Sequence, residues 1–145
     1  MILQKVFPDT GFLTPIEFLN LENLETLIIR NVNLVGELPN ELFMLDDLET
    51  IDISYTNLSG GLPDNIASAE DLEYLRLDHN NLKGTLPEAI GLLEDLLYLD
   101  LGHNNFSGDV PTSLCNISSV YVDDNELCGS IPSCLTGNYS NQNCN

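Results

Sequence analysis

The sequence is poor in basic residues. Its 145 residues include 4 Lys and Arg against 23 Asp and Glu, which gives a formal net charge of −19. Nucleic acids and anionic membrane surfaces attract clustered Lys and Arg, and this chain lacks such clusters. Tryptophan is absent, and no apolar run approaches the ~20 residues that cross a bilayer. We therefore expect no nucleic-acid partner and no direct membrane insertion.

The N-terminal segment also lacks the features of a secretory signal. The stretch MILQKVFP contains no apolar run of the ~7 to 15 residues typical of such signals. No signal peptide is therefore visible: it was removed or never present, or the chain is a piece of a longer protein. The acidity does not indicate disorder, because 43% of the residues are apolar and leucines recur along the whole length.

A repeat of 24 residues organises the sequence. Four copies open at Leu24, Leu48, Leu72 and Leu96, and the third copy reads LxxLxLxxNxLxGxLP. A fifth copy opens at Ile117, three residues early. A fixed period of about 20 to 50 residues is typical of solenoids, in which each repeat buries its apolar face against its neighbours.

Each LxL segment alternates like a strand and is followed by a polar position. Asn80, Asn104 and Asn125 occupy this position in the last three copies. Their amides can hydrogen-bond the backbones of neighbouring repeats and form a buried ladder. Thr56 can do this in part and Val32 cannot. The ladder should therefore begin at the second repeat, so the first repeat lies at an edge or has another cover.

The repeated phrase resembles the plant-type leucine-rich repeat, whose mark is the LxGx[I/L]P segment after the asparagine. Such repeats occur in plant receptor-kinase ectodomains and polygalacturonase-inhibiting proteins, and similar ones occur in algae. The resemblance covers about residues 13–135. It implies an α/β fold, a right-handed leucine-rich-repeat solenoid with a parallel β-sheet on the concave face and 3-10 segments on the convex face. It says less about function, because one scaffold can serve many partners.

We interpret residues 1–145 as a single leucine-rich-repeat domain. Residues 1–23 are an N-terminal edge or partial repeat, residues 24–116 are four full repeats, and residues 117–145 are the last repeat and a cysteine-containing C-terminal cap. A solenoid needs covers at both ends. The family usually pairs cysteines at the N-terminal end, but no cysteine precedes Cys115 here. Instead Phe7, Phe12 and Phe18 form either a compact lid or a surface for another chain.

All four cysteines lie in the last 31 residues, where the C-terminal cap is expected. An even number confined to a cap indicates two disulfides and an oxidising compartment, rather than reduced thiols or a zinc site. Because the last repeat is short, Cys134 overlies a position two residues from Cys115. Of the three possible pairings, we therefore predict Cys115 with Cys134 and Cys128 with Cys144.

Four Asn-x-Ser sequons are consistent with the same compartment, an extracellular space or an organelle lumen. They are candidate glycosylation sites of a secreted glycoprotein, at Asn57, Asn105, Asn116 and Asn138. Two of the four follow the NLSG wording of the repeat itself, so the sequons support secretion without proving it.

The outward residues of the strands should line the concave face in columns, with one residue from each repeat. Tyrosines beside carboxylates are typical of protein-binding surfaces, although a solvated sheet face is the alternative. The ligand-binding candidates are Tyr74, Arg76, Asp78, Tyr98, Asp100, His103, Tyr121 and Asp123. Because this face is acidic, its ligand is expected to be a basic protein or peptide.

A metal-binding or catalytic role is less favoured. His79 and His103 occupy identical repeat positions, and with Asp124 they could ligate zinc, but two exposed histidines are the simpler interpretation. We therefore expect no metal and no cofactor. No GxSxG elbow or phosphate loop occurs, so the chain is not expected to be an enzyme.

The leading hypothesis is a protein–protein recognition module that binds its ligand on the concave face. The alternative is a structural subunit of a larger assembly, held through an uncapped N-terminal end.

Overall fold

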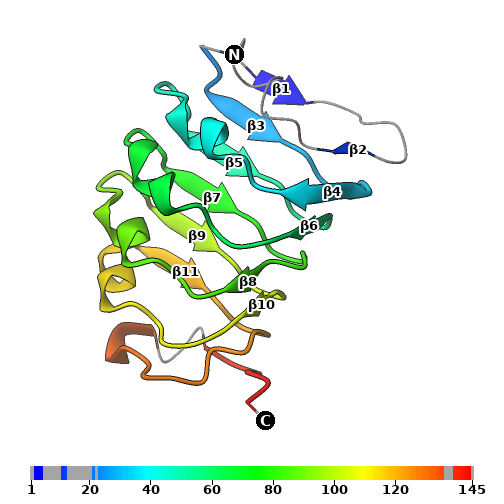
Figure 1. The fold of residues 1–145 in the computed structure, drawn as a ribbon. Coiled ribbons are helices and arrows are strands. Elements are labelled where there is room, and N and C mark those ends of the chain that lie inside the picture. The colour runs from blue at the N-terminus through cyan, green and yellow to red at the C-terminus, as the bar shows by residue number, and fades with distance from the viewer. Residues whose placement is uncertain (1, 5–10, 13–20, 22, 136–138, 145) are drawn as a thin grey trace.

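The computed structural model describes residues 2–4, 11–12, 21, 23–135 and 139–144. Its main element is a six-stranded parallel sheet in which successive repeats lie side by side (Figure 1). In spatial order the strands are β1 (Ile2–Gln4), β3 (Thr26–Ile28), β5 (Thr50–Asp52), β7 (Tyr74–Arg76), β9 (Tyr98–Asp100) and β11 (Ser119–Tyr121). The solenoid and its parallel sheet are thus confirmed.

Short lateral strands and 3-10 turns complete the coils. One lateral sheet contains β2 (Gly11–Phe12), β4 (Leu34–Glu37) and β6 (Asn57–Ser59), and another contains β8 (Lys83–Gly84) and β10 (Asn105–Phe106). The 3-10 turns lie along one side of the stack (Figure 1) and are η1 (Asn40–Met44), η2 (Asp64–Ser68), η3 (Glu88–Leu92), η4 (Thr112–Asn116) and η5 (Ser133–Leu135). No helix in the described part of the chain is long and apolar enough to cross a bilayer.

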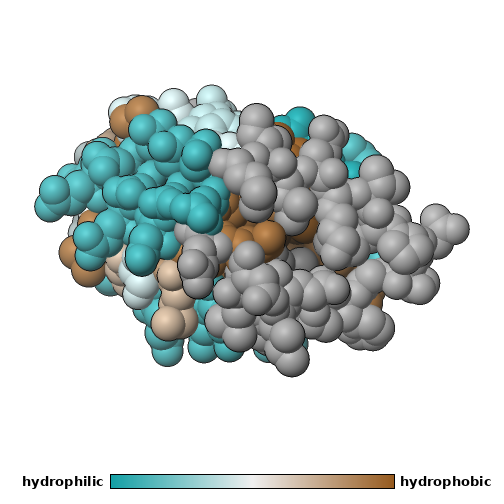
Figure 2. All heavy atoms as spheres, turned by 90° about the horizontal axis from the view of Figure 1, so that it is seen from above, coloured by the Kyte–Doolittle hydropathy of each residue, from teal (hydrophilic) through white to brown (hydrophobic). Residues whose placement is uncertain are grey.

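The repeated leucines form one continuous core. Leu27, Ile51, Leu75 and Leu99 sit at the centre of their strands, and each is fully buried. A single repeat cannot enclose its apolar side chains, so each coil depends on its neighbours for this burial. Seen from above (Figure 2), hydrophobic residues lie at the centre of one end of the stack and hydrophilic residues gather at one side. Stacking therefore fixes the fold through apolar contacts between successive coils.

A ladder of buried amides holds the coils in register. The Asn104 amide donates to the carbonyl oxygens of Leu77, Leu101 and Gly102 at 3.0 to 3.1 Å, and its Oδ1 accepts from Leu82 N–H at 3.0 Å. Asn80 and Asn125 make the same kind of contacts. The Thr56 hydroxyl donates to Asn80 Oδ1. The predicted ladder is confirmed for Asn80, Asn104 and Asn125, and Thr56 joins it through the Asn80 side chain.

The N-terminal end contributes two strands beyond the five copies recognised in the sequence, one to the main sheet and one to a lateral sheet. β1 pairs with β3 in parallel, with Ile2 opposite Thr26, and β2 pairs with β4. Both added strands fall in the segment interpreted as an edge or partial repeat. Strand β1 therefore supplies the other cover expected for the first repeat. Of the three phenylalanines expected to form a lid or a docking surface, Phe7 and Phe18 lie outside the described residues.

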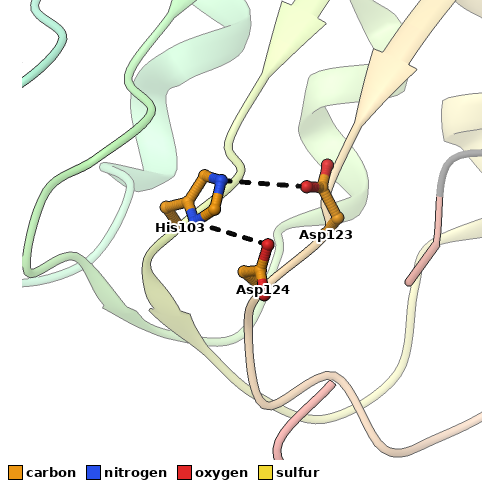
Figure 3. Close-up of side chains that lie close together, drawn as sticks. All are labelled: His103, Asp123 and Asp124. Atoms are coloured by element: carbon orange, nitrogen blue, oxygen red, sulfur yellow. Dashed lines mark ion pairs between the residues drawn. The ribbon is translucent and has the colours of Figure 1, made fainter. Parts of the chain in front are cut away.

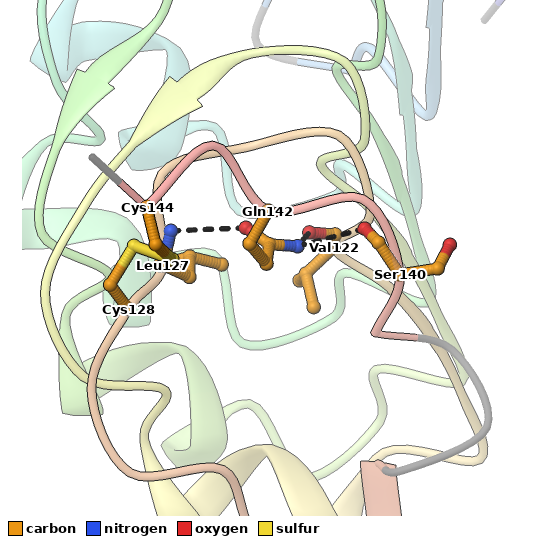
Figure 4. Close-up of a disulfide and its surroundings, with 6 residues drawn as sticks. All are labelled: Val122, Leu127, Cys128, Ser140, Gln142 and Cys144. Carbon is orange, nitrogen blue, oxygen red and sulfur yellow. Dashed lines mark hydrogen bonds between the residues drawn. A yellow bond between two sulfur atoms is a disulfide. The ribbon is translucent and has the colours of Figure 1, made fainter.

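The C-terminal cap continues the amide ladder with a residue that does not belong to any repeat. Gln142 Oε1 accepts from Leu127 N–H at 3.0 Å, and Gln142 Nε2 donates to the Val122 carbonyl at 2.9 Å (Figure 4). These are the two kinds of contact that Asn125 makes one coil earlier. The amide of Gln142 therefore satisfies backbone groups that would otherwise be exposed at the end of the stack.

Two disulfides hold this cap in place. Cys115 is joined to Cys134 with a Cα–Cα distance of 5.8 Å, and Cys128 is joined to Cys144 with a Cα–Cα distance of 5.6 Å. This is the pairing expected from the sequence. The second bridge lies two residues from Gln142 and fixes the tail against the last coil (Figure 4).

The ladder predicts a contrast between two adjacent asparagines. Asn104→Ala removes a buried amide and leaves carbonyl and N–H groups unpaired, so it should lower the free energy of unfolding by roughly 1 to 3 kcal/mol. Asn105→Ala alters an exposed side chain and should change stability little. Urea unfolding of the unglycosylated protein measures both. Equal losses in the two variants would show that the assigned phase of the repeat is wrong.

The two disulfides of the cap lead to a prediction about their pairing and their contribution to stability. Non-reducing peptide mapping should recover Cys115 linked to Cys134 and Cys128 linked to Cys144. The double substitution of Cys128 and Cys144 to Ser opens a loop with a sequence separation of 16 and should lower stability by about 3 kcal/mol. A peptide that joins Cys128 to Cys134 would contradict the pairing.

Candidate functional site

The parallel register places equivalent residues of successive repeats in columns across the concave face. Tyr74 lies opposite Tyr98, and Arg76 lies opposite Asp100. Asp100 in turn lies opposite Tyr121 on β11. Residues separated by a whole repeat in the sequence therefore become direct neighbours, at the strand spacing of about 4.8 Å.

One aromatic column crosses strands β7, β9 and β11: Tyr74 and Tyr98 begin their strands, and Tyr121, at the end of β11, continues the column. The rings of Tyr74 and Tyr98 are stacked, with centroids 4.4 Å apart and planes 4° from parallel. The ring of Tyr121 lies 5.5 Å from that of Tyr98 and is tilted by 43°. The structure thus brings the three predicted tyrosines into one continuous surface.

A second aromatic column follows the ends of the strands. The rings of Tyr55 and His79 are stacked at 4.0 Å, and the rings of His79 and His103 also lie 4.0 Å apart. All three residues have left-handed backbones, with φ between 53° and 55°. Non-glycine residues seldom adopt this conformation, so repetition of the turn is what aligns the rings. Tyr55 was not among the predicted binding residues, although its repeat position matches that of His79.

A network of charges lies between the two aromatic columns. Arg76 Nε lies 2.7 Å from Asp78 Oδ1 and 3.8 Å from Asp100 Oδ2, and Arg76 Nη1 lies 4.0 Å from Asp52 Oδ2. The hydrogen bond to Asp78 raises the pKa of the Arg76 guanidinium above its ordinary value, so this side chain stays charged. Asp52 is fully buried and also pairs with Arg30. Sequence reasoning did not include Asp52 and Arg30 in the site, although both lie in the columns.

Asp100 lies opposite Arg76 on the neighbouring strand β9. Burial raises the pKa of its carboxyl; the N–H of Gly102 opposes the rise, and the nearby Asp78 carboxylate adds to it. Burial also raises the pKa of the Tyr98 phenol, and Asp100 raises it further. The Tyr98 hydroxyl donates to Asp100 Oδ2 at 3.3 Å. Burial makes the charged form of this half-buried carboxyl unfavourable, so it is a candidate for pairing with a cation of a ligand.

Carboxylates surround His103 at the C-terminal end of the face. His103 Nδ1 lies 3.4 Å from Asp124 Oδ2, and His103 Nε2 lies 4.0 Å from Asp123 Oδ2 (Figure 3). His79 does not face this group, because its Nδ1 lies 2.7 Å from Asp78 Oδ2. The set of His79, His103 and Asp124 considered from the sequence is therefore not the one that converges: Asp123 takes the place of His79.

Three of the four candidate glycosylation sites are in the described part of the chain and lie outside the columns. Asn57 and Asn105 are exposed on the lateral strands β6 and β10, and Asn116 is exposed at the end of η4. The Asn57 amide donates to Asn33 Oδ1 at 2.7 Å. Asn138 lies outside the described residues. Glycans at the three described positions would leave the concave face open.

Comparison with known proteins finds the same repeat. Leucine-rich repeat family models match residues 22–82 and residues 95–117. No curated protein sequence matches the chain.

Solved structures resemble the chain over most of its length. A chain of the BIR3–SERK2 complex from Arabidopsis thaliana is 32% identical, with a TM-score of 0.76 over 82% of this chain and 69% of that chain. The Arabidopsis receptor kinase HAESA, in complex with the peptide hormone IDA and the co-receptor SERK1, is 27% identical, with a TM-score of 0.84 over 92% of this chain. A plant ice-binding protein is 30% identical, with a TM-score of 0.80 over 90% of this chain.

The similarity covers only part of two of these proteins. The chain spans 24% of the HAESA chain and 43% of the ice-binding protein. Because the similar structures include receptors and an ice-binding protein, their likeness establishes the scaffold but does not identify a ligand.

The raised pKa of Asp100 predicts a pH-dependent effect of its replacement. A carboxyl whose pKa is higher in the folded state contributes stability at low pH that is lost as the pH rises through that pKa. Asp100→Asn keeps the shape without the charge, so its stability relative to the wild type should increase from about pH 3 to about pH 7. Thermal unfolding measures this difference.

Asp71→Asn is the matched control, because it removes the same charge from an exposed position before β7. A gain for Asp100→Asn no larger than the gain for this control would contradict the assigned environment of Asp100.

Proposed function

Because this chain belongs to the leucine-rich repeat family, we propose that it is a recognition module that binds a basic protein or peptide segment on its concave face. The observation that carries the proposal is the pair of aromatic columns on either side of the Arg76 network. Receptor ectodomains of this family are typically non-catalytic binding modules.

The chemistry of the columns suits a ligand that carries Lys or Arg. Tyrosine rings offer large apolar contact area at little conformational cost, and their faces attract cations. Asp100, Asp123 and Asp124 lie next to the rings of Tyr98 and His103. A guanidinium or ammonium group that approaches this region gains both stacking and ion pairing. The repeated columns also suit an extended segment, whose side chains can occupy successive positions across the strands.

The similar structures support this type of ligand. One of them is a complex with a peptide hormone and a co-receptor, and another is a complex between two proteins. Two disulfides and the resemblance to extracellular receptor ectodomains indicate an oxidising, extracellular location. We further propose that the protein is secreted and carries glycans at Asn57, Asn105 and Asn116.

The alternative role, a structural subunit of a larger assembly, has one observation in its favour. β1 stands last in the order of the main sheet and is paired there with β3. An edge strand can add another strand from a second chain. Molecular mass in solution separates the two roles: a monodisperse monomer favours the independent binder, and aggregation relieved by a partner favours the assembly.

The binding proposal predicts which substitutions weaken binding. Tyr98→Ala or Tyr121→Ala should cost at least ~2 kcal/mol of binding free energy if either ring is central to the contact, because aromatic anchors carry a large share of interface energy. Tyr98→Phe keeps the stacked ring and should retain most of the affinity. Association should also slow as the salt concentration rises. The measurement is biolayer interferometry against a partner recovered from native extract.

Glu37→Ala is the control, because Glu37 is exposed on the lateral strand β4, away from the concave face. This substitution should change the binding affinity little. The concave face would be rejected, and the assembly role favoured, by one pattern of alanine variants. In that pattern the affinity stays unchanged for variants of the concave face and falls for variants of Phe7, Phe12 or Phe18. The concave-face variants to compare are those of Tyr74, Arg76, Tyr98, Asp100, His103 and Tyr121.

A further inference from the structure

Three potential metal ligands converge at the ends of two neighbouring strands. His103 follows β9, and Asp123 and Asp124 follow β11 (Figure 3). One ligand atom from each residue can be chosen so that all three lie within 4.8 Å of one another. Among the described residues, this is the one group of three or more His, Cys, Asp or Glu side chains that meets this criterion.

The spacing is compatible with zinc after a rotation of the Asp123 side chain. Ligand atoms around a tetrahedral zinc ion lie about 3.3 Å apart when the bonds are about 2.0 to 2.1 Å long. The distance from His103 Nδ1 to Asp124 Oδ2 is 3.4 Å. Asp123 Oδ2 lies 4.0 Å from the other ring nitrogen, Nε2, so its carboxylate must turn toward Nδ1 to share one ion with Asp124. The side chains of His103, Asp123 and Asp124 are 44%, 30% and 34% exposed, which leaves room for this rotation.

The backbone beneath this group is fixed. His103 N–H donates to the Asp123 carbonyl at 2.9 Å, and Asn104 N–H donates to the Asp124 carbonyl at 3.2 Å. Asp124 N–H donates to the Ser140 carbonyl of the cap at 3.0 Å. On its other face, the ring of His103 rests against the ring of His79. The three side chains therefore start from backbone positions that need no rearrangement, which lowers the cost of binding a metal ion.

The two carboxylates of the group favour a bound cation. Within the described part of the chain, the arginine ion pairs are those of Arg30 with Asp52 and of Arg76 with Asp52, Asp78 and Asp100. None of these pairs extends to Asp123 or Asp124. A histidine nitrogen favours zinc and related transition metals over calcium or magnesium, which prefer oxygen ligands.

From this geometry we propose that His103, Asp123 and Asp124 bind one zinc ion, with a fourth position left for water or for a ligand atom of another molecule. The site goes beyond the proposed recognition function and departs from the expectation of no metal. His79 is not a ligand, because its Nδ1 faces Asp78; its ring supports that of His103.

The test is calorimetric titration of zinc chloride into the full chain, without an affinity tag and after dialysis against a chelator. The cysteines are held in disulfides and offer no thiolate ligands. One equivalent of zinc should bind. His103→Gln and Asp124→Asn should each weaken binding by about tenfold or more, because each removes a direct ligand. His79→Gln, the matched substitution one repeat earlier, removes no ligand and should weaken binding much less than His103→Gln does. Calcium chloride should not compete at equal concentration.

Nuclear magnetic resonance provides a second readout, because the chain has 2 histidines and each ring can be followed separately. Zinc should shift the ring nitrogen signals of His103 much more than those of His79, and this result does not depend on a variant that folds. Zinc binding at several equivalents, unchanged by His103→Gln, would show adventitious binding to the acidic surface and overturn the site. Equal losses in His79→Gln and His103→Gln would also overturn it. Neither outcome involves a protein partner, so the recognition function is tested separately.

Discussion

The structure depends on the need to hydrogen-bond peptide groups that turn into the core of each coil. After each strand the chain bends inward, where carbonyl and N–H groups meet neither water nor a sheet partner. Asn80, Asn104 and Asn125 satisfy these groups with buried amides that contact their own coil and the one before it. A buried unpaired group costs more than a typical hydrogen bond contributes, which favours an amide at this position. The first two repeats, next to the N-terminal edge, carry Val32 and Thr56 there instead. The amide ladder fixes the register of the coils, and all other columns follow from that register.

The candidate binding face is a consequence of this register. Because the strands repeat in register, Tyr74 lies on Tyr98 and His79 lies on His103. The rings of each column therefore stack on one another, whatever the other column contains. The same alignment sets Arg76 among three carboxylates from its own and both adjacent strands. The result is a rigid surface whose side chains are largely ordered before a ligand arrives. Such order lowers the entropy lost on binding, which favours recognition of a flexible segment.

Much of this could be predicted from the sequence, because the repeat is regular and its period is unambiguous. The leucine positions predict the core, the LxL segments predict the strands, and the asparagines predict the ladder. Gln142 could not be predicted, since it replaces a ladder asparagine from a tail that shares no spacing with the repeats. Strand β1 was missed because a three-residue strand carries too little pattern to identify. The pairing of His79 with Asp78, and hence the role of Asp123 beside His103, depends on side-chain orientation, which a repeat position does not determine.

We propose that this chain meets its partner on the concave face that the amide ladder aligns. Hydrogen–deuterium exchange of the chain with and without a bound partner tests it most directly, because both faces are measured in one experiment. We expect added protection in residues 74–79, 98–103 and 119–124, and unchanged exchange in the lateral segments 33–37 and 105–109. Protection confined to the lateral segments or to residues 2–4 and 11–12, with no change across strands β7, β9 and β11, would contradict it.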